Sequence, residues 1–292
     1  MQTPRGFVVV DKPPGMTSHD VVARVRRQLG IRRVGHGGTL DPMATGVLIL
    51  GVGDATRLLQ WVSSGDKCYE ATLHLGSSTT TDDAQGELLK IASPAAVAAI
   101  TEQEIGAAFD SFRGTIQQVP SRVSAIKVAG VRAYTRARSG EEFDLIPREV
   151  QISKLDWSVV TRGPDFVDVA LALCCSSGTY VRALARDIGD ALGIGGHLTS
   201  LRRTRVNGFT LDDASPIEAI TANSVVRIEV CARRILPTVA VDPSDESNIR
   251  HGRPIAWPSV GVGTVALLSA DGVLLAVCHE ADGRTRYDCV FA

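Results

Sequence analysis

Asp41 is the residue whose surroundings point most directly to chemistry, because it is the single carboxylate of the glycine-rich stretch 35–46. Four glycines and a proline share this stretch with it, and glycine permits positive backbone torsions and the close approach of a ligand. The composition predicts a rigid loop that holds a carboxylate at a cleft. A turn in which Asp41 only caps the backbone is the alternative, and the stretch alone does not decide between the two.

Arg182 and Tyr69 are further candidates. Arg182 follows the polar run 176–180, in the first turn of a predicted helix. The helix dipole opposes a cation there, typically by ~0.3–1 kcal/mol, so a carboxylate or phosphate partner would explain its position. A solvent-facing arginine is the alternative. Tyr69 shares parity with the apolar residues of a predicted strand, which favours a core tyrosine over a platform for stacking.

Other groups of residues carry weaker signals. His36 has no second His or Cys nearby at a spacing suited to a metal, so a loop histidine that contacts substrate is favoured. The run 201–205 holds three arginines and predicts either a surface that contacts phosphates or a solvated face. The six cysteines form no zinc or C-x-x-C pattern and are predicted to be buried thiols in a reducing compartment, with no structural metal.

Residues 47–56 allow a different interpretation, because an apolar strand followed by Gly51 and Gly53 resembles the start of a dinucleotide-binding fold. The phosphate-binding helix of that fold needs a third small residue where Thr56 stands. Asp54 also places a negative charge where the pyrophosphate would lie. An oxidoreductase that binds NAD or NADP is therefore the less favoured alternative.

Periodicity and capping residues predict the elements that must position these side chains. Helical spacing with a possible Ser18 N-cap and a stop at Gly30 predicts a helix between them, and period-two alternation predicts a strand over 68–75. Thr101 and Glu104 form a capping box. Further strands are predicted at 7–10, 47–50, 150–160 and 166–175, and further helices at 54–62, 180–192 and 224–235. Residues 113–150 predict a largely irregular, basic excursion from the core.

Length and composition limit the class of protein. The 292 residues are 44% hydrophobic and 22% charged, which is typical of a folded chain with a sizeable core. No apolar run reaches the ~18–20 residues that span a bilayer, so a cytosolic protein is expected. The net charge is −1, yet residues 1–60 hold eight Lys and Arg against four Asp and Glu. Such a cluster is compatible with a local polyanion site, but charge alone favours a solvated surface.

Six motifs in order resemble the TruB-type family of pseudouridine synthases, which modify uridine 55 in the TΨC loop of tRNA. They cover residues 7 to about 210 and lie at 10–18, 35–46, 66–69, 124–127, 177–182 and 197–203. The second of these motifs, at 35–46, normally carries a threonine at the position of Gly37. An ordered set of six is far more specific than any one of them.

The resemblance implies an α+β fold. It predicts a catalytic domain over 1–237 around a largely antiparallel mixed sheet, with the basic excursion at about 113–150. The β-rich tail 238–292 resembles a shortened PUA-type RNA-binding barrel, and residues 251–255 echo its usual motif. No cofactor or metal is expected, since the isomerisation of uridine to pseudouridine requires neither. A monomer is also expected.

The resemblance also implies roles for individual residues. Asp41 would be the nucleophile, Tyr69 would stack on the flipped base and take part in proton transfer, and Arg182 would pair with Asp41. The residues expected to bind substrate are His36, Tyr180, Leu201, Lys12, Arg202 and Arg203. Pulling a base from its stack costs a few kcal/mol, and stacking on an aromatic ring returns ~1–3 kcal/mol.

Phosphate contacts must supply the rest of the binding energy. The basic segments 24–33, 113–138 and 202–205 are the candidates, which predicts that tRNA binding weakens as salt rises. A protein that binds or folds tRNA without catalysis is the rival hypothesis. The presence of Asp41, Tyr69 and Arg182 together favours the enzyme.

Overall fold

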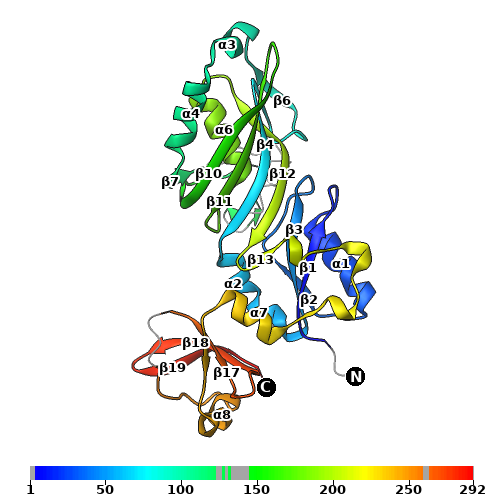
Figure 1. The fold of residues 1–292 in the computed structure, drawn as a ribbon, viewed down its shortest axis with the longest axis vertical. Helices are drawn as coiled ribbons and strands as arrows, with labels where there is room; N and C mark the ends of the chain where they lie inside the picture. Colours follow the sequence, from blue (N-terminus) through cyan, green and yellow to red (C-terminus); the bar gives the residue numbers. More distant parts are fainter. Residues whose placement is uncertain (1–3, 123–126, 129–130, 133–144, 259–262, 292) are drawn as a thin grey trace. The chain divides into compact units, whose positions relative to one another are not determined.

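The computed structural model describes residues 4–122, 127–128, 131–132, 145–258 and 263–291 (Figure 1). Contacts divide the chain into unit 1, residues 1–65 with 205–292, and unit 2, residues 66–204. The N-terminal strands and the C-terminal residues share one apolar core, which contains Phe7, Ile49, Leu268 and Phe291. The domain boundary expected at residue 237 stays a prediction.

Unit 1 is built around the strand β1 (Gly6–Lys12), which pairs antiparallel with β3 (Thr45–Val52). β3 also pairs antiparallel with β2 (Val34–Gly37). Two short strands complete the edge at β1, namely β14 (Ser215–Pro216) in parallel and β15 (Val226–Arg227) antiparallel. The sheet is therefore mixed and largely antiparallel. A dinucleotide-binding fold needs a parallel strand at this place, so the antiparallel pairing of β3 on both sides excludes that alternative.

Helix α1 (Ser18–Leu29) shows how the local sequence sets the first helix of unit 1. Thr17 is its N-cap and forms a capping box with Asp20, and the helix ends at Gly30 with φ +67°. The expected cap was Ser18, one residue later. Ser18 is instead buried, and its hydroxyl is hydrogen-bonded to the backbone of Leu40.

The C-terminal part of unit 1 contains an open four-stranded sheet. Its strand order is β16 (Thr238–Ala240), β17 (Val265–Leu268), β18 (Leu274–Ala281) and β19 (Arg284–Val290). The strands described between residues 238 and 290 do not close on one another, so the expected PUA-like barrel is not confirmed. Helices α7 (Ile228–Ile235) and α8 (Pro243–Arg250) precede and flank this sheet.

Unit 2 is built on a row of hydrogen-bonded strands. Its strand order is β12 (Gly196–Val206), β4 (Lys67–Leu75), β11 (Val167–Cys175), β10 (Arg148–Arg162) and β7 (Gly114–Gln118). Helices α4 (Glu102–Ser111) and α6 (Val181–Ala191) cover one face of it. On that face Trp157 of β10 stacks on Phe109 of α4, with 5.4 Å between ring centroids. Tyr69 lies on the same covered face, opposite Leu173.

The other face of this sheet carries a disulfide. Cys68 of β4 is directly opposite Cys174 of β11 in the antiparallel register, with 4.1 Å between their Cα atoms, and the two sulfurs are bonded. The expectation that all six cysteines are thiols is therefore wrong for these two. The other four are buried thiols. Residues that are 106 positions apart become neighbours only through the strand register.

The expected excursion at 113–150 lies partly outside the described residues, at 123–126, 129–130 and 133–144. Its ends are regular, because β7 and the start of β10 pair antiparallel from Gln118–Arg148 to Gly114–Ile152. Between them β8 (Lys127–Val128) pairs with β9 (Val131–Arg132). The prediction of an irregular segment is wrong at these ends.

The remaining elements are short. In unit 1 they are the 3-10 helices η1 (Gly53–Leu58), η2 (Leu211–Asp213), η3 (Ile217–Ala219) and η4 (Ala222–Ser224), helix α2 (Leu59–Ser64) and strand β13 (Phe209–Thr210); in unit 2 they are β5 (Ser77–Thr79), β6 (Leu88–Ile91) and α3 (Pro94–Ala99). Among the residues described, no helix combines the length and the apolar character that crossing a bilayer requires.

Candidate active site

The segment between β2 and β3 carries Asp41, and neighbouring residues fix its backbone. The hydroxyl of Ser18 accepts a hydrogen bond from the amide of Leu40 at 2.9 Å and donates one to the carbonyl of Leu40 at 3.1 Å. On the other side, the carbonyl of Pro42 accepts bonds from the amide of Gly15 at 2.8 Å and from Lys12 Nζ at 3.2 Å. Asp41 itself is half-buried. The loop is thus held by its backbone on both sides of the half-buried Asp41.

Lys12 and Gly37 have structural explanations in this region. Lys12 is fully buried, and its ammonium group donates to the carbonyls of Pro13 and Pro42. These contacts hold the loop of Asp41. Gly37 packs against α2, where an added Cβ would lie 2.6 Å from Cγ1 of Val62. A side chain at position 37 would therefore require Val62 of α2 to shift.

His36 lies half-buried on β2 and meets the ring of His19 edge-on, with 5.1 Å between centroids. No group of three or more His, Cys, Asp or Glu side chains suited to a metal ion occurs within the described part of the chain. Nearby, Asp54 pairs with Arg33 at 2.7 Å on the surface.

Arg182 is buried in the first turn of α6, with 4% of its surface exposed. Its Nη1 donates to the carbonyl of Thr81 at 2.7 Å and lies 3.3 Å from Oδ2 of Asp83. Asp83 is equally buried. A carboxylate partner compensates for the charge of a buried guanidinium near the positive end of a helix. The solvent-facing alternative is therefore wrong, and Asp83 is a partner that the sequence analysis did not find.

A second ion pair lies one helical turn further along α6. Nη1 of Arg186 is 3.3 Å from Oδ2 of Asp82 and its Nη2 is 2.7 Å from Oδ1 of Asp187. Burial raises the pKa of Asp82, an effect that Ser121 and the two arginines oppose. The backbone of Asp82 is left-handed, with φ +59°, and its carbonyl accepts from the amide of Leu198 on β12 at 3.1 Å. The loop that holds Arg182 is thus anchored at several points.

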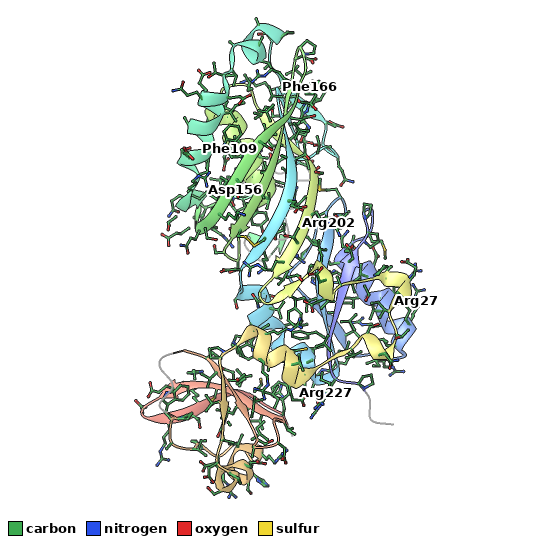
Figure 2. All side chains as sticks on the ribbon, in the orientation of Figure 1. Arg27, Phe109, Asp156, Phe166, Arg202 and Arg227 are labelled. Atoms are coloured by element: carbon green, nitrogen blue, oxygen red, sulfur yellow. A yellow bond between two sulfur atoms is a disulfide. The ribbon has the colours of Figure 1, made fainter. Side chains whose placement is uncertain are left out.

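The remaining candidates lie on the sheet of unit 2 and at the start of α6. Tyr69 has 8% of its surface exposed, and Leu201 has 7%. Arg202 is half-buried on β12 (Figure 2), whereas Arg203 is 1% exposed, so this arginine is not part of a solvated face. Tyr180 is the N-cap residue of α6.

Lys67 is a buried cation on the same strand face as Tyr69, two residues before it. Burial and the charge of Arg203 lower the pKa of Lys67 to about 8. The covered face of the sheet therefore combines a tyrosine with two buried cations.

Family models match most of the chain. Residues 26–181, more than half of the chain, match the TruB family pseudouridylate synthase (N terminal domain), and residues 182–239 match the tRNA pseudouridylate synthase B C-terminal domain. The chain belongs to the TruB family of pseudouridylate synthases. Such synthases are isomerases, so this TruB-family chain is an enzyme of that class.

TruB-family relatives cover nearly the whole chain. A protein named tRNA pseudouridine synthase B from Mycobacterium sp. (strain KMS) is 49% identical over 283 residues, which are 96% of this chain and 94% of the relative. A protein of the same name from Thermobifida fusca (strain YX) is 49% identical over 292 residues, 98% of each chain.

A solved structure has the same fold. A chain in the crystal structure of a Cbf5-Nop10-Gar1 complex superposes with a TM-score of 0.74 at 25% identity, over 98% of this chain and 85% of that one. Residues 240–291 lie outside both family models.

The TruB-family residues fall into two groups by unit. Asp41, His36 and Lys12 belong to unit 1, whereas Tyr69, Tyr180, Arg182 and Leu201 belong to unit 2. The expected pairing of Asp41 with Arg182 therefore stays a prediction. The residues that sequence reasoning missed are Asp82 and Asp83. The sequence signal that could have indicated them is a pair of adjacent carboxylates in the polar run 77–86, which contains no basic residue.

Proposed function

We propose that this TruB-family enzyme isomerises uridine 55 in the TΨC loop of tRNA to pseudouridine. The observation that carries the proposal is the identity of 48–49% to proteins named tRNA pseudouridine synthase B over 96–98% of the chain. The reaction breaks the bond between C1′ of the ribose and N1 of uracil and forms one between C1′ and C5. The proton at C5 is lost and N1 gains one, so no net oxidant, reductant or phosphoryl donor is required.

Asp41 is the proposed nucleophile of this reaction. The residue is half-buried, and hydrogen bonds to Leu40 and Pro42 fix the backbone on either side of it. A nucleophile held on a fixed backbone loses little freedom when the reacting atoms meet.

Arg182 is the proposed partner of Asp41, and Asp83 with Thr81 orients its guanidinium before substrate arrives. A guanidinium beside a carboxylate favours the ionised, nucleophilic form. Tyr69 is proposed to stack on the flipped uracil and to take part in proton transfer, and His36, Tyr180 and Leu201 are proposed to contact the displaced nucleotide. These roles rest on the family motifs that carry the residues.

Binding of tRNA is proposed to use arginines. Arg202 on β12 and Arg27 on α1 (Figure 2) lie in the basic segments 202–205 and 24–33, whereas Arg203 of β12 is buried. Lys12 acts through the loop of Asp41, given its bonds to Pro13 and Pro42. The tail 238–292 is proposed to contact RNA in the manner of a PUA domain. We further propose that the enzyme works as a monomer in the cytoplasm without a cofactor.

Replacing Asp41 with Asn tests the proposal. Wild-type protein should convert a uridine-containing TΨC stem-loop, and the product is read by mass spectrometry after derivatisation of pseudouridine. The Asp41→Asn variant should make no detectable product while its affinity for the stem-loop stays within a few fold. Asp54→Asn, which changes an exposed carboxylate of the same unit, is the control and should keep full activity.

Two results would contradict the proposal. Product from Asp41→Asn would show that another group is the nucleophile. Wild-type protein that binds the stem-loop without converting it would favour the rival hypothesis of an RNA-binding protein.

A further inference from the structure

We propose that Gln118 is a positioning residue that sets the start of α6, and with it the direction of Arg182. Gln118 is the last residue of β7 and is 1% exposed. Its side chain makes two hydrogen bonds to one residue 62 positions away, Tyr180. This inference rests on the proposed function, because Arg182 and Tyr180 are site residues only within it.

The two bonds engage both backbone groups of Tyr180. The amide of Tyr180 donates to Oε1 of Gln118 at 2.8 Å, and Nε2 of Gln118 donates to the carbonyl of Tyr180 at 3.1 Å. An amide side chain can act as donor and acceptor at once in the same way as a neighbouring strand. Because the amide of Tyr180 can only donate and its carbonyl can only accept, this pairing fixes which end of the Gln118 amide is oxygen.

The position of Tyr180 explains why such a tether is needed. Tyr180 is the N-cap of α6, where Ser, Thr, Asp or Asn normally supplies a capping hydrogen bond, and its side chain supplies none. Its carbonyl also accepts the first helical bond, from the amide of Leu184 at 3.0 Å. Gln118 therefore holds the residue from which the helix begins, two residues before Arg182.

A second contact fastens the same end of β7 to α6. Nη2 of Arg186 donates to the carbonyl of Val119 at 2.7 Å, while its Nη1 faces Asp82. Gln118 and Val119 are thus attached to Tyr180 and to Arg186 of α6, respectively. Arg182 lies between these two points, so a loss of the Gln118 tether should let its end of the helix move.

Substitution of Gln118 by Glu and by Met separates the effect of its hydrogen bonds from the effect of its side-chain volume. Gln118→Met keeps the size of the side chain and removes both hydrogen bonds. Gln118→Glu keeps the shape, but its ionised form cannot donate to the carbonyl of Tyr180. Burial raises the pKa of such a carboxyl, and once protonated it regains the missing donor. The neighbouring Gln117 is exposed on the same strand, so Gln117→Met and Gln117→Glu are matched controls.

The expected result is a loss in kcat with a specific pH dependence. A misplacement of about 1 Å costs up to about 100-fold in rate, and we expect kcat at pH 8 to fall by about 10-fold or more in both Gln118 variants, with the stem-loop Kd within about threefold of wild type. For Gln118→Glu the deficit relative to wild type should shrink as the pH falls toward 6. For Gln118→Met it should stay constant.

Hydrogen exchange gives a readout that does not depend on activity. In Gln118→Met the backbone amide of Tyr180 should exchange faster than in Gln117→Met, as measured by mass spectrometry of a peptide that spans 176–184.

Four outcomes would overturn the inference. They are kcat values equal to those of the Gln117 controls, a Gln118→Glu deficit that is independent of pH, a rise in KM with unchanged kcat, and unchanged exchange at Tyr180. If wild-type protein makes no pseudouridine, the proposed function fails and so does the role of Gln118 in it, while the exchange measurement still decides whether the tether exists.

Discussion

The loop that carries Asp41 and the helix end that carries Arg182 are held by different kinds of interaction. In unit 1, the Ser18 hydroxyl and the Lys12 ammonium group bind backbone groups on either side of Asp41. In unit 2, Arg182 is held by the carboxylate of Asp83, and both side chains are 5% exposed. The loop of the half-buried Asp41 is held through its backbone, whereas the arginine is fixed by a buried pair of opposite charges.

This difference predicts that the free energy of unfolding falls by different amounts when the group that holds Arg182 or the group that holds the loop of Asp41 is removed. A buried ion pair leaves an uncompensated charge when one partner is lost, which costs more than the loss of neutral hydrogen bonds. Substitutions in the two units therefore test the comparison, and the expected effects fall from buried charge to surface charge.

Asp83→Ala should have the largest effect, because it leaves the Arg182 guanidinium buried without its carboxylate. Removal of one member of a buried pair costs about 3–5 kcal/mol, which urea unfolding would measure as a fall in the free energy of unfolding. Asp156→Ala removes the exposed partner of Lys154 and should change stability by less than about 1 kcal/mol. Similar values for the two variants would contradict the comparison.

Removing the Cys68–Cys174 disulfide of unit 2 should have the next largest effect. The bond links residues 106 positions apart, and loss of such a link typically costs about 2–4 kcal/mol. Cys68→Ser combined with Cys174→Ser should lower the free energy of unfolding by that amount in the absence of reductant. A reductant should destabilise wild-type protein equally and leave the double variant unchanged. Equal stability of oxidised wild type and the double variant would show that the link is not formed.

Ser18→Ala tests the loop of unit 1. It leaves the amide and the carbonyl of Leu40 without the hydroxyl that binds both, at a cost of about 1–3 kcal/mol. Thermal unfolding would measure the loss, and the rate of pseudouridine formation should fall with it because the loop of Asp41 loosens. Ser64→Ala removes an exposed hydroxyl bonded to Trp61 and is the control. If Ser18→Ala lowered the stability more than Asp83→Ala does, the comparison between the two units would be wrong.

Asp54→Asn should have the smallest effect. The pair Arg33–Asp54 lies on the surface of unit 1, with 55% and 48% of the two side chains exposed. Exposed pairs of this kind contribute about 0–1 kcal/mol, and salt screens even that. Unfolding at low and high salt should therefore give nearly equal stabilities for wild type and variant. A difference above about 2 kcal/mol would show that this surface charge is coupled to the fold.

Much of the local structure could be predicted from the sequence. Alternation predicted a strand at 68–75, where β4 runs from Lys67 to Leu75, and the capping box of Thr101 with Glu104 begins α4. The ordered motifs indicated the family, which the matches over 26–239 confirm. These features depend on residues within a few positions of one another, whose side chains act on their own backbone.

The interactions that shape the candidate site were not predictable in this way. Arg182 joins Asp83 across 99 positions, Gln118 joins Tyr180 across 62, and Cys68 meets Cys174 across 106. Each depends on which distant segments the fold brings together: paired strands for the two cysteines, and the start of α6 against a loop or the end of β7 for the other two contacts. No pattern of neighbouring residues specifies such contacts. A strand with the same alternation, for example, can pair in another register or with another partner. The sequence by itself determined the elements and the family, while the tertiary structure decided which carboxylate holds the arginine and which side chain holds the helix.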